Sequence, residues 1–154
     1  MKMLKVLLAA ALAGIALYFI YSLFKDLTKT EDLSGPMSHL GSVRSALQIY
    51  YGDHDGRFPV DGLSCLVEPS EEPGKGRYLD KMPVLWDNAR SGREYPHPPT
   101  SEVAAYPAGA APTDTGKWGY HNDPSFPAAW GGFFIDCTHI NQVPGGNGQP
   151  WSVF

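Results

Sequence analysis

The chain has 154 residues, of which 43% are hydrophobic, and its formal net charge is −4 at pH 7. This length and composition allow one domain with an apolar core and exclude a chain that is disordered throughout. Once Lys2 and Lys5 are set aside, ten basic residues stand against 16 acidic ones, so we expect no nucleic-acid partner.

Residues 6–24 form an uncharged apolar run behind Lys2 and Lys5. As a helix this run would be roughly 28 Å long, close to the thickness of a bilayer core. It predicts a single-pass anchor in the inner membrane at residues 1–27, with a periplasmic head at residues 28–154. A signal peptide cleaved after Ala13 is the alternative, although the apolar run continues well beyond that point.

The segment after the predicted anchor carries a helical pattern that ends at an acidic corner. Apolar residues recur at spacings of three and four, which predicts a helix with one buried stripe. The stripe consists of Met37, Leu40, Val43, Leu47 and Tyr50. Glycine and aspartate at residues 53–56 favour a capped helix end over a calcium loop, because the remaining oxygen ligands of such a loop are missing.

The second half of the chain predicts loops and short strands. Short helices or turns are expected at residues 62–67 and 78–83, and the prolines and alanines of residues 87–116 predict a long irregular loop. Aromatic runs separated by glycine and proline turns predict three strands. These runs are residues 117–120, 132–137 and 151–154.

The predicted fold class is α+β. A long N-terminal helix, made of the membrane anchor and the amphipathic half, is expected to pack on a small antiparallel sheet. Trp118, Phe133 and Trp151 are expected to bury the largest areas, since aromatic side chains dominate small cores.

Two cysteines, Cys65 and Cys137, lie far apart without C-x-x-C spacing. Outside the cytoplasm they predict one disulfide, with buried unlinked thiols as the alternative. A zinc site that combines these cysteines with His121 and His139 is disfavoured, because the spacings are irregular and a disulfide explains the cysteines more simply.

Three stretches resemble the type IV pilin and type II secretion pseudopilin family, in particular the major pseudopilins. They are VRSALQIYYGDHDGRFPVDGLSCLV, RYLDKMP and GFFIDCTHINQVPGGNGQPWSVF. The resemblance implies a structural subunit without catalytic activity that polymerises through its hydrophobic N-terminal helix into a pilin-like filament or pseudopilus. It also implies other pilin-like subunits, the inner membrane and the secretion or pilus assembly machinery as partners.

The same resemblance implies a candidate calcium ligand set, since some pseudopilins hold calcium in the loop between their last strands. The candidate residues in this chain are Asp114, Asn122, Asp123 and Asp136. Their spacing matches no calcium motif, so solvated turn residues remain the alternative and no cofactor is required.

A second hypothesis is a membrane-anchored periplasmic binding module with a pilin-like head that does not polymerise. It is favoured by Lys5, which stands near the position where the family has a glutamate. Its binding surface would use aromatic residues of the loops, namely Trp86, Tyr95, Tyr106 and Trp130. An enzyme is not expected, because Ser64 and Ser152 lack a nucleophile motif.

Overall fold

The computed structural model describes residues 14–15, 17–22, 35–69, 76–87, 94–107, 109–142 and 148–154. Its contacts divide the chain into two compact units, residues 1–34 and residues 35–154. In the first unit the described residues are helical. Their large apolar side chains are more than half exposed, at Ile15, Leu17, Tyr18, Phe19, Ile20 and Tyr21.

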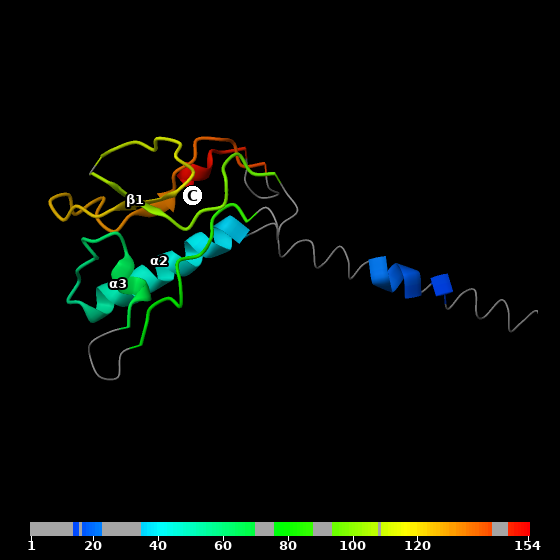
Figure 1. Ribbon diagram of the computed structural model, residues 1–154, viewed down its shortest axis with the longest axis horizontal. Coiled ribbons are helices and arrows are strands. Elements are labelled where there is room, and N and C mark those ends of the chain that lie inside the picture. Colours follow the sequence, from blue (N-terminus) through cyan, green and yellow to red (C-terminus); the bar gives the residue numbers. More distant parts are fainter. Residues whose placement is uncertain are drawn as a thin grey trace, which may run out of the picture. The chain divides into compact units, whose positions relative to one another are not determined.

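The second unit is built on helix α2, which spans Gly35–Asp53 (Figure 1). Pro36 lies in its first turn, where a missing N–H costs nothing and the fixed φ suits a helix. The predicted apolar stripe is confirmed. Its members are buried or pack against the core: Met37, Leu40, Val43, Leu47 and Tyr50.

The acidic corner after α2 is a capped helix end, as predicted. The Gly56 N–H donates to the Tyr51 carbonyl at 3.0 Å. Asp55 and Gly56 both have left-handed backbones, with φ of 52° and 75°, which aspartate and glycine tolerate better than most residues. The His54 ring stacks on Tyr50, with ring centroids 3.7 Å apart.

Helix α3, Ser64–Val67, is held by the carboxylate of Asp61. Oδ1 of Asp61 accepts a hydrogen bond from the Leu63 N–H at 3.0 Å. Oδ2 accepts one from Ser64 Oγ at 2.8 Å and one from the Cys65 N–H at 3.1 Å. Asp61 therefore satisfies the free donors at the start of this short helix.

The sheet has the strand order β1-β2-β3, with β1 at Val103–Tyr106, β2 at Trp118–His121 and β3 at Phe133–Ile135. β2 is the central strand; it pairs with β1 in parallel and with β3 in antiparallel orientation. The prediction of an antiparallel sheet is therefore wrong. β1 lies inside the predicted loop and contains two alanines, whose weak strand propensity is outweighed by pairing with β2.

The predicted strand at residues 151–154 is also wrong. Trp151–Val153 forms a 3-10 turn, η2, that follows Pro150. The Ser152 N–H donates to the Cys137 carbonyl at 3.0 Å, and the Trp151 N–H donates to the His139 carbonyl at 3.1 Å. These bonds hold the C-terminal tail beside the segment that follows β3.

The core lies between α2 and the sheet (Figure 1). α2 contacts β3, and Arg44 Nε donates to the Phe133 carbonyl at 2.9 Å. Arg44 also donates through Nη2 to the carbonyl of the last residue, Phe154. Trp118, Phe133 and Trp151 are buried, as predicted.

The predicted long N-terminal helix packed on a sheet is wrong. Within the described ranges only α2, with 19 residues, is longer than two turns, and it begins at Gly35. A proline at the next position favours a helix start there, because its ring clashes with a preceding helical turn.

Across the described residues the structure contains no helix with the length and apolar character that a membrane span requires. This finding contradicts the predicted single-pass inner-membrane location. Of the predicted anchor at residues 6–24, residues 14–15 and 17–22 are described, and the others lie outside the described residues.

Candidate metal centre

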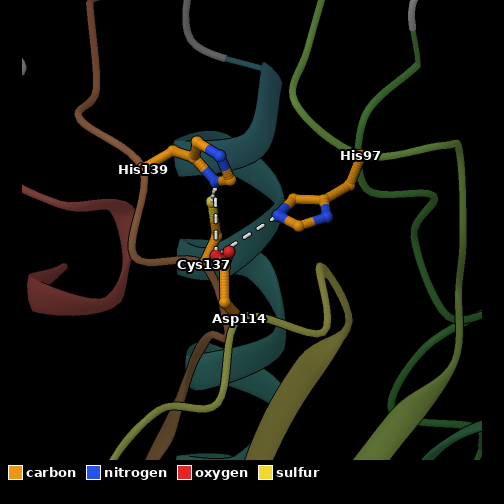
Figure 2. A group of neighbouring side chains, drawn as sticks. All are labelled: His97, Asp114, Cys137 and His139. Carbon is orange, nitrogen blue, oxygen red and sulfur yellow. Dashed lines mark hydrogen bonds and ion pairs between the residues drawn. The ribbon is translucent and has the colours of Figure 1, made fainter.

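Four metal-ligating side chains converge at the end of the sheet. His97 comes from the loop before β1, Asp114 from the connection between β1 and β2, and Cys137 and His139 from the segment after β3. One ligand atom from each of the four lies within 4.8 Å of all the others. Figure 2 shows the two imidazoles, the thiol and the carboxylate turned toward one another.

The Asp114 carboxylate lies between the two histidines. Its Oδ1 lies 3.4 Å from His97 Nε2 and 3.3 Å from His139 Nδ1. Cys137 Sγ lies 3.5 Å from the same nitrogen of His139. Oδ1 of Asp114 also accepts the Thr138 N–H at 2.7 Å, and this hydrogen bond is the main cause of its lowered pKa.

The solvent exposure of the four side chains increases from Cys137 to His139. Cys137 is fully buried, the His97 side chain is 13% exposed, and the His139 side chain is 52% exposed. Burial raises the pKa of the Cys137 thiol to about 12, so without a cation the thiol keeps its proton at neutral pH. His97 Nε2 is buried and makes no hydrogen bond within the described part of the chain.

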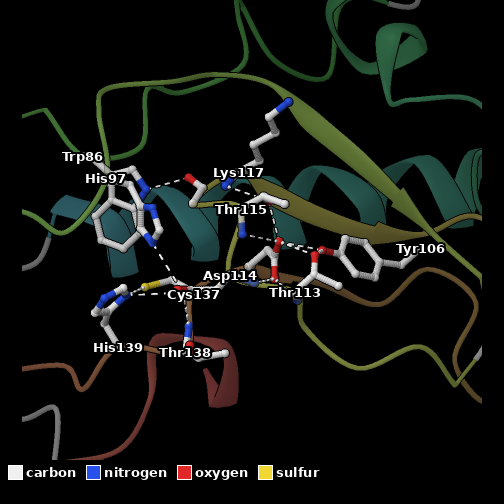
Figure 3. Close-up of polar contacts among 12 residues, drawn as sticks. Trp86, His97, Tyr106, Thr113, Asp114, Thr115, Lys117, Cys137, Thr138 and His139 are labelled. Atoms are coloured by element: carbon white, nitrogen blue, oxygen red, sulfur yellow. Dashed lines mark hydrogen bonds and ion pairs between the residues drawn. The ribbon is translucent and has the colours of Figure 1, made fainter.

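Asp136 shapes the loop that carries Asp114. The N–H groups of Thr113 and Asp114 donate to its Oδ1 at 2.7 and 3.0 Å, and the Thr115 N–H donates to its Oδ2 at 2.9 Å. Tyr106 Oη donates to the same Oδ2 at 2.5 Å, and Thr115 Oγ1 is a further donor. Figure 3 shows this arrangement around Tyr106, Thr113 and Thr115.

The charge of Asp136 is stabilised by these donors although the residue is fully buried. Burial alone would raise its pKa, but the hydrogen bonds from Thr115, Tyr106 and Thr113 outweigh burial and lower the pKa to about 2. Asp136 is thus a positioning residue, because it fixes the backbone from which the Asp114 side chain reaches the two imidazoles.

Because Gly116 has no side chain, the His97 ring can pack against the backbone of this loop. The φ of Gly116 is +72°, and a Cβ at this position would lie 2.3 Å from Cγ of His97. Trp86 Nε1 donates to the Gly116 carbonyl at 2.6 Å, and Asp114 itself has a left-handed φ of 65°. A backbone held in such conformations at a cluster of ligands is typical of functional sites.

The predicted calcium ligands do not form one site. Asp114 belongs to the cluster described above, whereas Asp136 is occupied by backbone donors. Asn122 Nδ2 donates to the Val60 carbonyl at 3.2 Å, and Asp123 Oδ1 accepts the Ser125 N–H at 2.9 Å. Asn122 therefore links the end of β2 to the segment before α3, and Asp123 stabilises a local turn.

The predicted disulfide is absent from the structure, where Cys65 and Cys137 are both free. Cys65 Sγ donates to Asp61 Oδ1 at 3.5 Å, whereas Cys137 faces His139. Each sulfur has a polar partner of its own. Of the disfavoured zinc set, Cys137 and His139 belong to the cluster, and Cys65 and His121 do not.

Sequence reasoning missed His97 and did not combine Asp114 with Cys137 and His139. The signal that could have pointed to the site is the Cys-Thr-His triplet at the end of the predicted strand at residues 132–137, since two side chains that can ligate a metal are separated there by one residue. His97 and Asp114 lie 17 residues apart on separate loops, and only the fold brings them together.

The loop aromatics of the binding-module hypothesis are only partly available at the surface. Trp86 is fully buried and Tyr106 is 5% exposed, so both are core residues. Tyr95 and Trp130 are half-buried. Trp130 packs edge-on against Phe58, with ring centroids 6.0 Å apart.

The four-residue cluster at residues 97, 114, 137 and 139 is therefore the site with the clearest chemical character in the described chain. Comparison with known protein families, with characterised proteins and with solved structures gave no match to this chain.

Proposed function

We propose that this chain is a structural subunit, without catalytic activity, of a pilin-like filament or type II secretion pseudopilus. The observation that carries the proposal is the set of exposed apolar side chains at residues 15 and 17–21. These six side chains are 51–70% exposed. Apolar patches of this kind mark interaction surfaces, because water leaves them when a partner covers them.

The partner in this proposal is the same segment of other copies. A helical surface of large apolar and aromatic side chains suits a filament core in which identical helices pack together. The globular unit at residues 35–154 has an apolar core of its own.

Further support comes from the resemblance to the pilin and pseudopilin family. The stretch that ends α2 is part of that resemblance, and it forms a capped helix end followed by the short helix α3. The alternative hypothesis, a binding module that does not polymerise, has less support because Trp86 and Tyr106 are not available at the surface.

The proposal is tested with Phe19→Lys in the full chain, expressed in the native host. Ile49→Lys on α2 is the matched control, because Ile49 is 59% exposed and Phe19 is 63% exposed. Sheared filaments are pelleted, the chain is quantified by mass spectrometry, and total cellular chain is measured in parallel.

We expect Phe19→Lys to be depleted from the filament pellet at least about tenfold, because a lysine in an apolar interface leaves an unpaired charge. Ile49→Lys should remain at the wild-type level. The proposal is wrong if the wild-type chain is absent from the pellet, or if both variants are recovered equally.

A further inference from the structure

We propose that His97, Asp114, Cys137 and His139 bind one Zn²⁺ as a structural site that fastens the C-terminal tail to the loops around β1. This inference is independent of the proposed filament, because it concerns only the globular unit. It rests on the geometry of the four side chains, on their donor chemistry and on the way in which the surrounding residues hold them.

The separations between the ligand atoms match a tetrahedral site. Zinc bonds of about 2.0–2.3 Å to nitrogen, oxygen and sulfur place tetrahedral ligands about 3.3–3.7 Å apart. The three separations given above, 3.3, 3.4 and 3.5 Å, all lie in this range. Since no pair of ligand atoms exceeds 4.8 Å, small side-chain rotations complete the tetrahedron.

The chemical types of the four ligand atoms favour Zn²⁺ over other common metal ions. A thiolate and two imidazoles are ligands that Zn²⁺ prefers, whereas Ca²⁺ and Mg²⁺ require oxygen donors. One thiolate from Cys137 and one carboxylate from Asp114 balance the two positive charges of the ion. The loaded site is therefore neutral, which suits a position whose sulfur is fully buried.

The protons also balance. As the Zn–S bond forms, Cys137 Sγ releases its proton to solvent, and the carboxylate of Asp114 binds without proton transfer. Each histidine binds as neutral imidazole through a ring nitrogen, Nε2 of His97 and Nδ1 of His139. No oxidant, reductant or further reactant is needed.

Two features show that the site is held in place without a cation. The buried His97 Nε2 makes no hydrogen bond among the described residues and points toward Asp114. Gly116 leaves room for the His97 ring, and a side chain there would displace it. An imidazole that is kept in a fixed position, with a nitrogen that makes no hydrogen bond, is ready to ligate, because little rotamer freedom is lost on binding.

Four protein ligands fill a tetrahedral coordination shell, so the site is closed and structural and leaves no position for a substrate. The zinc would join the loop before β1, the β1–β2 connection and the tail after β3. In this chain the metal would thus provide a long-range cross-link at Cys137, but to residues 97 and 114 and not to Cys65 as the predicted disulfide would.

The test uses the full chain, purified with zinc present and then passed through gel filtration, with metal content measured by mass spectrometry. Cys137→Ser removes the thiolate, and Cys65→Ser is the matched control because Cys65 lies outside the cluster. Affinity is measured by competition with a chromogenic chelator.

We expect about one equivalent of zinc in the wild type and in Cys65→Ser, and an affinity at least about a hundredfold weaker in Cys137→Ser. If Cys137→Ser does not fold, His139→Gln at the open side of the site serves instead, with His121→Gln as its control. The proposal is overturned if folded wild type retains less than about a tenth of an equivalent, or if the ligand and control variants lose zinc equally.

Discussion

The surroundings of Cys65 and Cys137 have the same effect on the thiol pKa, but the carboxylates beside the two thiols have different roles. Burial raises the pKa of both thiols to about 12. Beside Cys65 lies Asp61, and beside Cys137 lie Asp114 and two imidazoles. The burial of a thiol therefore does not decide whether it can be a ligand, and the neighbouring side chains do.

The carboxylates differ because of the backbone around them. Asp61 is committed to the first turn of α3, where both of its oxygens accept N–H or hydroxyl donors. In the second region Asp136 takes this role for residues 113–115, so Asp114 can turn its side chain toward the imidazoles. The Asp136 carboxylate holds the backbone of the loop, and the Asp114 carboxylate accepts the Thr138 N–H and faces the two imidazoles.

The largest effect should come from Asp136→Asn. The amide cannot accept all the buried donors around it, and we expect the free energy of unfolding to fall by about 3 kcal/mol. Asp61→Asn, at the corresponding position beside Cys65, should cost at most about 1 kcal/mol, because asparagine also caps helices. Urea unfolding of the metal-free proteins measures both, and equal losses would refute the division of roles between Asp136 and Asp114.

Gly116→Ala should have an intermediate effect. The new Cβ meets the His97 ring and sits on a left-handed backbone, which together should cost about 2 kcal/mol and weaken zinc binding. Gly62→Ala, near Cys65, is the control, because nothing lies within 4 Å of its Cβ. That change should stay within about 0.5 kcal/mol. Thermal unfolding measures both variants. If Gly116→Ala has the same stability as wild type, the loop can move to accommodate the new Cβ and the expected effect is wrong.

The smallest effect concerns alkaline pH and Cys65. Its pKa is raised from 9.0 to about 12 in the folded state, so its contribution to stability is complete below pH 9 and is lost as pH rises toward 12. Cys65→Ser should therefore show a flatter stability profile than wild type between these values. Parallel profiles in urea unfolding series would mean that the thiol titrates alike in the folded and unfolded states.

The sequence allowed prediction of those parts of the fold that depend on local contacts. The spacing of Leu40, Val43 and Leu47 identified the buried face of α2, and the glycines and aspartates after it identified the helix end. β1 could not be predicted, because its alanines form a strand only when they pair with β2.

The candidate site was predictable only in part for the same reason. Cys137 and His139 are neighbours in sequence, so their pairing could be considered from spacing alone. Asp114 reaches them through the β1–β2 connection, whose path depends on the buried Asp136, and His97 reaches them from the loop before β1. Buried polar contacts between distant residues leave no periodic pattern in a sequence.

The central claim, that Cys137 and not Cys65 is a metal ligand, is tested most directly by the absorption spectrum of the Co²⁺-substituted full chain. We predict intense visible bands of tetrahedral Co²⁺ and a near-ultraviolet thiolate-to-cobalt band in wild type and Cys65→Ser, with the thiolate band lost in Cys137→Ser. A wild-type spectrum without a thiolate band, or a band that disappears in Cys65→Ser, would contradict the account.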